Sequence, residues 1–275
     1  GTTIELYLYS RTIEIMKFIR PFLINFYSFS HNIKLIIKQM KTITIAFLML
    51  FSVSMVAQTN TELKKHYEAY YKQMKKQGDV QGIINAMTHL EVLEPSVARR
   101  DTLAYIYLSE GQYMQAINTI GVEKSDTDSD INVEVKALAL KNLNQPKMAL
   151  EHFEVLFIRN PNVYLAYEMA DMKIQINDLV GAKLNIDYGL ANVKDDMKRT
   201  FYERQQPYET SMKAALLYLK GLLKYTENKT ANMDTALALI NEALAIDPNF
   251  NIAKISREAL EAQKAQKAAA AAKKE

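Results

Sequence analysis

A unit of about 34 residues recurs along this chain, and a repeat of that length restricts the fold to a few architectures built by stacking. The clearest copy starts at a Gly78–Asp79 turn, continues with apolar residues three and four positions apart, and ends at Pro95. That spacing puts the apolar side chains on one face of a helix, which the proline then ends. Pro95 and Pro161 are 66 residues apart, close to two periods, so the repeat persists through the middle of the chain.

The composition agrees with a helical fold. Only 8 Gly and 6 Pro occur among 275 residues, which argues against many tight hairpins. Abundant Ala, Leu, Lys, Glu and Met favour helices. The chain has no cysteine, which excludes disulfides, thiolate metal sites and a cysteine nucleophile. One helix pair cannot bury both of its faces, so neighbouring pairs must stack to cover them.

The repeat resembles the tetratricopeptide repeat family. In that family small residues stand where two antiparallel helices cross closely, a large or aromatic residue stands near the turn, and a proline follows the second helix. The residues that match this pattern are Tyr113, Phe153, the small residues Ala116, Ala149 and Ala236, and the prolines Pro95, Pro161 and Pro248. The resemblance covers residues 63–250, with good and degenerate repeats in succession.

The chain departs from the family pattern at several places. The tryptophan of the family's first helix is absent, Ile83 replaces the small residue of the first repeat, and no proline ends the second repeat. The unit at 178–196 is weak, because Gly189 stands mid-helix and costs about 1 kcal/mol relative to Ala. An extra stretch, 226–234, separates the helices of the last repeat. Since degenerate repeats are usual in the family, the expected fold is unchanged.

The resemblance implies an all-α fold, a right-handed superhelix of antiparallel helix pairs: an α-solenoid of about five repeats with a C-terminal capping helix. We expect this repeat domain over residues 62–262, with the polar stretch 192–211 as a hinge or irregular connection. Residues 263–275 form an Ala/Lys-rich tail without an apolar stripe, which should be helical at most transiently.

Residues 40–57 have the pattern of a secretory signal peptide. A start methionine and one lysine form a short positive region, a 14-residue apolar run follows, and Ala57 supplies the small residue of a cleavage site before Gln58. The run is shorter than the roughly 20 residues that span a bilayer, which favours cleavage over retention as an anchor. We therefore expect a periplasmic or otherwise exported chain that meets the membrane only transiently.

The first 39 residues have a different composition. Residues 1–39 contain no Ala, Val or Asp, and Ile, Phe and Tyr make up 15 of them. We interpret them as an over-extended N-terminus outside the fold, with a first membrane segment as the alternative. From Gln58 onward the chain has 28 basic and 29 acidic residues, so its net charge is near −1. This balance does not give the excess of positive charge that nucleic-acid binding requires.

Residues that could carry catalysis are scattered. The histidines lack a Glu or His partner at ligand spacing: His31, His66, His89 and His152. Asp126, Asp128 and Asp130 alternate like the start of a calcium loop, but Ile131 stands where such a loop needs glycine. No glycine-rich phosphate loop and no Gly-x-Ser-x-Gly elbow occurs. We expect no cofactor, no metal and no enzymatic activity.

The resemblance also implies which positions face the concave groove. In the family these are the second, fifth, ninth and twelfth positions of each first helix. The residues at such positions are Lys65, Glu68, Lys72 and Lys75; Asp101, Tyr105 and Leu108; Glu134, Leu138 and Lys141; and Tyr218, Leu222 and Tyr225. They lack the dense Lys/Arg set with which chaperone-binding members hold a peptide's terminal carboxylate.

These features predict an exported protein–protein interaction scaffold. It would bind a protein or peptide partner in the groove, through Tyr and Leu anchors flanked by charged residues. One alternative is a membrane-tethered envelope assembly factor that keeps residues 42–57 as an anchor; a mature N-terminus at Gln58 would exclude it. Another is a helical accessory subunit of an enzyme, or a weak hydrolase, which a desolvated pair of titratable groups would favour.

Overall fold

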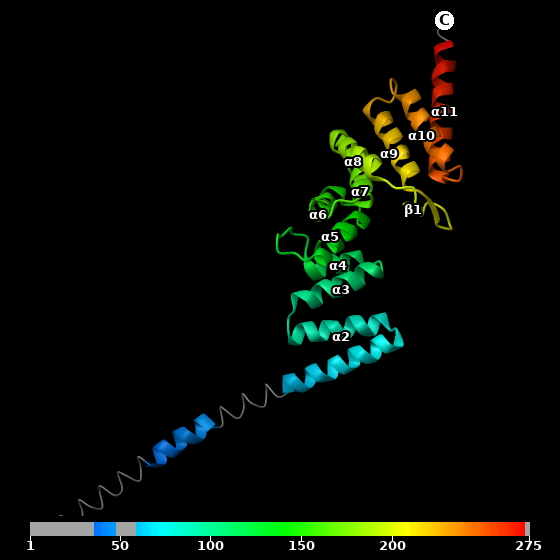
Figure 1. The fold of residues 1–275 in the computed structure, drawn as a ribbon. Coiled ribbons are helices and arrows are strands. Elements are labelled where there is room, and N and C mark those ends of the chain that lie inside the picture. The colour runs from blue at the N-terminus through cyan, green and yellow to red at the C-terminus, as the bar shows by residue number, and fades with distance from the viewer. Residues whose placement is uncertain (1–35, 48–58, 273–275) are drawn as a thin grey trace, which may run out of the picture. The chain divides into compact units, whose positions relative to one another are not determined.

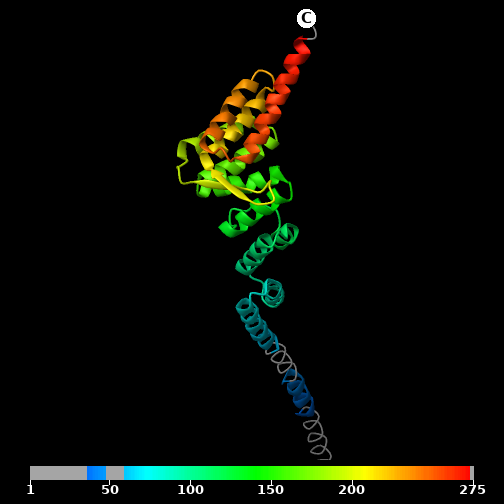
Figure 2. The same ribbon diagram turned by 90° about the vertical axis from the view of Figure 1, so that its right-hand side faces the viewer.

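The computed structural model of the protein describes residues 36–47 and 59–272. The chain divides into two compact units, residues 1–73 and 74–275, and each is described by itself. Figure 1 shows the ribbon coloured along the chain, and Figure 2 shows it turned by a quarter.

In the first unit, residues 36–47 form a helix whose apolar side chains are exposed. Residues 48–58, which hold most of the predicted signal peptide and its cleavage site, lie outside the described residues, as do 1–35 and 273–275. None of the helices within the described ranges is both long and apolar enough to cross a membrane. A second helix, over residues 59–77, spans the boundary between the two units.

The second unit is a succession of helices. They are α2 (Val80–Leu93), α3 (Val97–Ser109), α4 (Tyr113–Ile120), α5 (Asp130–Asn142), α6 (Pro146–Arg159), α7 (Val163–Gln175), α8 (Leu179–Asn192), α9 (Met212–Glu227), α10 (Met233–Ile246) and α11 (Asn251–Ala272). From α3 onward each helix contacts the next, so neighbours in the sequence are neighbours in space (Figures 1 and 2). We call the first helix of each pair helix A and the second helix B. The predicted all-α solenoid of helix pairs with a capping helix is confirmed.

Four of the turns from helix A to helix B are spaced 33 residues apart. In each of these four turns one residue has a left-handed backbone; these residues are Gly78, Gly111, Asn144 and Asn177, with φ of 69°, 70°, 56° and 62°. Glycine adopts this conformation without strain, and asparagine tolerates it better than most residues. The next amide then donates to the carbonyl five residues back, as Gln145 N does to Leu140 O at 2.9 Å. Such turns satisfy the last carbonyls of helix A and set the period of the solenoid.

Small residues allow the helices to approach closely, as the family pattern predicts. Alanines are fully buried in both helices of three successive pairs, at Ala104 and Ala116, Ala137 and Ala149, and Ala170 and Ala182. Gly189 has the same role between α8 and α9, because a Cβ at this position would lie 2.7 Å from Cδ2 of Leu216. Close packing thus accounts for a glycine that helix propensity disfavours.

A β-hairpin interrupts the solenoid between α8 and α9. β1 (Lys198–Phe201) pairs antiparallel with β2 (Tyr208–Ser211), the first residue of one strand opposite the last of the other. The ring of Phe201 packs 5.0 Å from the ring of Phe250, which stands in the turn between α10 and α11. The prediction of a hinge or irregular connection at 192–211 is therefore wrong over the strands, because aromatic packing orders this polar segment.

Helix α11 continues through residues 263–272, which were expected to be helical at most transiently. The extension lacks an apolar stripe, and polar contacts hold it, including one from Lys267 Nζ to Thr230 Oγ1 at 3.4 Å. The hydroxyl of Tyr225 donates to Gln263 Oε1 at 2.8 Å, and Lys264 Nζ lies 2.6 Å from Asp234 Oδ1. The last helix pair thus supplies partners that the isolated tail lacks.

Candidate partner-binding groove

A cavity opens between α5 and α7, the helices A of two successive pairs. Its volume is about 460 Å³. It is lined by Asp130, Glu134 and Leu138 of α5, by Phe153, Leu156 and Arg159 of α6, by Asn160 and Asn162 of the following turn, and by Tyr164, Leu165 and Glu168 of α7. The more deeply buried members are mainly apolar and the exposed members are polar or aromatic. That combination suits the side chains of another molecule.

Helix geometry explains why these residues face the cavity. On α5 the lining residues are Asp130, Glu134 and Leu138, spaced four apart, so they share one face of the helix. On α7 the side chain of Asn162 accepts a hydrogen bond from Leu165 N at 2.9 Å, which fixes where the helix begins. The local sequence therefore sets both walls of the cavity.

Most charged groups at the cavity are paired with one another. Arg159 Nη1 lies 2.8 Å from Asp130 Oδ1. Glu168 pairs through one oxygen with Lys141 and through the other with Arg199 of β1. Burial by itself would raise the pKa of Glu168, but the two cations outweigh burial and hold that pKa below its ordinary value. The ionised carboxylate ties the hairpin to α7.

The hairpin contacts α7 at Tyr167 as well as at Glu168. The guanidinium carbon of Arg199 lies 4.1 Å from the centre of the Tyr167 ring, a cation–π contact. Burial raises the pKa of Tyr167. Burial and then the charge of Glu168 raise the pKa of Asp171, whose side chain accepts a hydrogen bond from Gln175 at 3.3 Å. Because Arg199 binds a lining residue, the hairpin borders the cavity.

Four predicted groove residues belong to the helix over 59–77. Lys65, Glu68 and Lys72 lie in the first unit, and Lys75 lies in the second. All four are exposed. They are separate in the chain from the cavity-lining residues, and they remain predictions.

The predicted residues of α5 line the cavity or bind a residue that lines it, and Tyr105 and Leu108 of α3 lie outside its lining. Glu134 and Leu138 line it, and Lys141 binds the glutamate of α7 that also lines it. On α3, Tyr105 is 47% exposed and Leu108 is half-buried. Tyr105 precedes Leu138 by 33 residues, so the two occupy the same position of successive helices A.

The predicted residues of α9 are engaged by α11. Tyr218 is buried, and its hydroxyl lies 2.9 Å from Ser256 Oγ. Tyr225 and Leu222 are half-buried, and the Tyr225 hydroxyl donates to Gln263. The capping helix therefore binds the hydroxyls of Tyr218 and Tyr225, and the structure does not present Tyr218 on a free surface.

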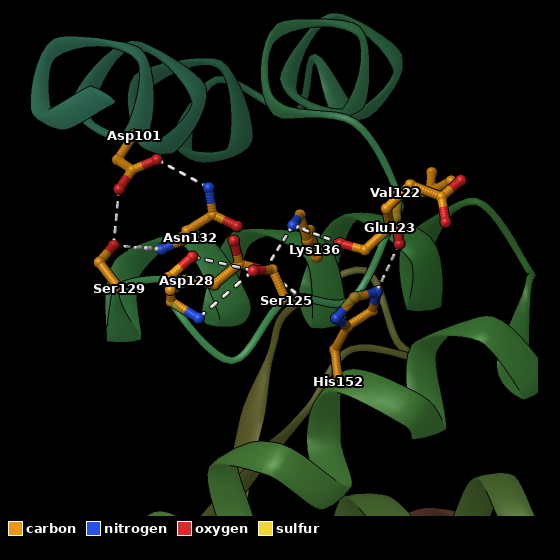
Figure 3. Close-up of polar contacts among 10 residues, drawn as sticks. Asp101, Val122, Glu123, Ser125, Asp128, Ser129, Asn132, Lys136 and His152 are labelled. Atoms are coloured by element: carbon orange, nitrogen blue, oxygen red, sulfur yellow. Dashed lines mark hydrogen bonds and ion pairs between the residues drawn. The ribbon is translucent and has the colours of Figure 1, made fainter. Parts of the chain in front are cut away.

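Asp101, another predicted groove residue, is also buried. Its carboxylate accepts hydrogen bonds from Ser129 Oγ at 2.6 Å and from Asn132 Nδ2 at 2.7 Å (Figure 3). Ser129 in turn caps α5 by accepting a hydrogen bond from Asn132 N. The structure thus places Asp101 in the joint between α3 and α5.

Tyr164 was missed in the sequence, although it is 46% exposed at the cavity. It follows Ile131 by 33 residues, so the repeat period could have found it. The repeat formed by α7 and α8 has a weak sequence pattern, because Gly189 stands in the middle of α8. Arg199 had no comparable signal, since it reaches α7 from the hairpin insertion.

A polar network replaces the end of helix B in the second repeat. Helix α4 has only eight residues, and the loop over 121–129 follows it. The buried Lys136 of α5 donates to Glu123 O at 2.6 Å and pairs with Asp128 Oδ2 at 2.7 Å (Figure 3). Asp128, part of the calcium-like pattern, is thus bound by a lysine. In the part of the chain that the structure describes, no group of three His, Asp or Glu side chains could hold a metal ion.

His152 binds the loop over 121–129 and lies below Val122 in Figure 3. It is buried, and its Nε2 lies 2.9 Å from Val122 O. A carbonyl oxygen only accepts, so Nε2 carries the proton, and the buried Nδ1 has no hydrogen-bond partner among the residues that the structure describes. Burial, assisted by the charge of Lys136, lowers the pKa of His152 below its ordinary value of 6.5, although the bond to Val122 opposes this.

The lowered pKa of His152 predicts that acid destabilises the protein. Below about pH 6.5 the His152 side chain is protonated in the unfolded chain but stays neutral in the folded chain. The free energy of unfolding therefore falls as the pH falls through that range. His152→Gln can still donate to Val122 O but does not titrate. Urea denaturation at about pH 7.5 and about pH 5.5 measures the loss, which should be smaller in the variant. Equal losses in both proteins would contradict the prediction.

No protein-family model and no curated protein sequence matches the chain. Solved structures do match it. A tetratricopeptide repeat protein from Parabacteroides merdae superposes with a TM-score of 0.55 and 17% identity, over 77% of this chain and 77% of its own. YrrB, described as a TPR protein with an unusual peptide-binding site, gives a TM-score of 0.55 and 14% identity, over 74% of this chain and 97% of its own.

A third solved structure, MamA, gives a TM-score of 0.50 and 15% identity, over 68% of this chain and 93% of its own. At these identities the likeness concerns the fold. It agrees with the helix pairs, the recurring left-handed turns and the buried small residues. The chain has the fold of a tetratricopeptide repeat solenoid.

Proposed function

We propose that the protein is an exported scaffold that holds a segment of another protein against the helix-A faces of α3, α5 and α7. The observation that carries the proposal is the cavity between α5 and α7, with its apolar interior and polar border. Its volume of about 460 Å³ lies within the range of about 300–1,000 Å³ typical of ligand pockets. YrrB, which shares the fold, is also described as having a peptide-binding site.

A binding role fits the cavity better than catalysis. An acid–base catalyst needs titratable groups that converge on a reacting atom. Here Glu168 is bound to Lys141 and Arg199, and Arg159 is bound to Asp130. Groups paired in this way hold elements together and leave the apolar surface as the feature that another molecule can use.

The binding role predicts that Tyr105 and Tyr164 act as anchors. Tyrosine is enriched among the hot-spot residues that dominate interfaces, and truncation of such a residue to alanine costs about 2 kcal/mol or more. We expect the double variant Tyr105→Ala/Tyr164→Ala to lose at least about tenfold in partner retention, measured by quantitative pull-down from envelope extract.

A matched control removes apolar surface elsewhere. Val180 and Leu184 on α8 are 77% and 66% exposed and lie outside the cavity lining. The double variant Val180→Ala/Leu184→Ala should retain the same partners as the unmodified protein. If the tyrosine variant also keeps them, the site is not at α3, α5 and α7.

Export is the second part of the proposal, and the signal-like pattern at residues 40–57 supports it. The expected result is a mature chain that begins at Gln58, determined by N-terminal sequencing of protein isolated from the envelope fraction. A chain that keeps residues 40–57 would favour the membrane-tethered factor. A chain that stays in the cytoplasm would contradict export.

A further inference from the structure

The charges at the cavity limit what kind of segment can enter it. Four lining residues are charged: Asp130, Glu134, Arg159 and Glu168. Asp130 and Arg159 neutralise each other, and Glu168 is bound by two cations. Glu134 is exposed, and its side chain has no hydrogen bond or ion pair with any residue that the structure describes. One lining carboxylate therefore remains available.

The cationic side chains of Lys141, Arg159 and Arg199, by contrast, are already bound in ion pairs with carboxylates of this protein. Lys141 and Arg199 both bind Glu168, and Arg159 binds Asp130. An acidic side chain entering the cavity would meet Glu134 and would have to displace an existing carboxylate to find a cation. Repulsion between like charges, here between Glu134 and an acidic side chain, contributes to specificity because it disfavours the wrong partner.

The apolar side chains next to Glu134 add a second requirement. Leu138 lies one helical turn further along α5, and Tyr164 stands on the opposite wall with nearly half of its surface exposed. A bulky apolar side chain between these two walls would bury both. A basic side chain beside it would reach Glu134.

We infer that the partner segment carries a Lys or Arg next to a bulky apolar residue, with the basic side chain on Glu134 and the apolar one between Leu138 and Tyr164. This inference rests on the proposed function and specifies its partner. Glu134 recognises the segment by a charge-assisted hydrogen bond, which is about twice as strong as a neutral one.

The test is selection from a phage-displayed library of random short peptides by the full chain. We expect the selected peptides to be enriched in Lys or Arg beside Leu, Phe or Tyr. With Glu134→Arg the enrichment should change to Asp or Glu. The matched control is Glu242→Arg, because Glu242 is exposed on α10, away from the cavity, and it should select the same peptides as the unmodified protein.

A measured affinity gives the second readout. A selected peptide should bind Glu134→Gln about fivefold to tenfold more weakly than the unmodified chain, since one ion pair is lost. Circular dichroism confirms that the variant is folded. An affinity unchanged by this substitution would overturn the inference.

The outcomes separate the inference from the proposed function. Peptides that depend on Tyr105 and Tyr164 but show no basic preference would overturn the inference and leave the proposed function standing. Failure of the unmodified chain to select any peptide would overturn both. Self-association in sedimentation that Glu134→Arg abolishes would make a second copy the occupant and would also overturn the inference.

Discussion

Replacing Lys136 with methionine should lower the free energy of unfolding by about 3–5 kcal/mol, the usual loss when one partner of a buried ion pair is removed. Lys136 is almost fully buried and binds both Glu123 O and Asp128 Oδ2. Methionine fills most of the same volume but leaves the partly buried Asp128 carboxylate without its cation, with Ser125 N as its remaining donor, and leaves Glu123 O without the lysine donor. Urea denaturation followed by circular dichroism measures the change.

Two further variants make the Lys136 prediction specific. Lys264→Met removes an exposed ion pair with Asp234 and should lower stability by less than about 1 kcal/mol. Lys136→Met combined with Asp128→Leu removes both buried charges and should recover much of the loss, because no ion then remains unpaired. Equal losses in Lys136→Met and Lys264→Met would show that the loop network does not stabilise the fold.

Replacing Phe250 with alanine should lower stability by about 3–5 kcal/mol, the range for a buried phenylalanine truncated in a packed core. Phe250 is fully buried, and its ring lies 5.0 Å from that of Phe201 and 5.3 Å from that of Tyr218. It joins the hairpin to α9 in one aromatic cluster. We therefore also expect faster proteolysis in the exposed hairpin turn over 202–207.

The matched control for Phe250 is Tyr202→Ala. Tyr202 is an aromatic residue of the same hairpin that is mostly exposed, so its loss should change stability by no more than about 0.5 kcal/mol. If Phe250→Ala unfolds at the same urea concentration as the control, the aromatic cluster does not hold the hairpin.

The repeat could be read from the sequence because its signals are local. The left-handed turn residues Gly78 and Gly111, the small Ala116 and Ala149, and the terminating Pro161 act within one or two helices. Such residues are constrained by backbone geometry and by contact with the next helix. The helical class and the capping helix followed from them.

The candidate site was predicted only in part. Glu134 and Leu138, two of the predicted groove residues, line the cavity between α5 and α7, and both belong to a regular repeat. Tyr164 was missed because Gly189 made its repeat look degenerate. Gly189 is in fact required where Leu216 packs against α8.

The sequence by itself determined the period and the helix pairs, and its resemblance to the repeat family implied the positions at which a helix-A residue could face outward. Only the tertiary structure decided which of those positions stay free. Asp101 is covered by Asn132, and Tyr218 by Ser256, through contacts between residues 31 and 38 positions apart. The burial of a side chain depends on which element packs against its helix face. The hairpin is an insertion into the repeat and α11 is an addition after it, so the repeat pattern does not predict which faces they cover. Periodicity therefore predicts the scaffold, whereas the open surface results from long-range packing.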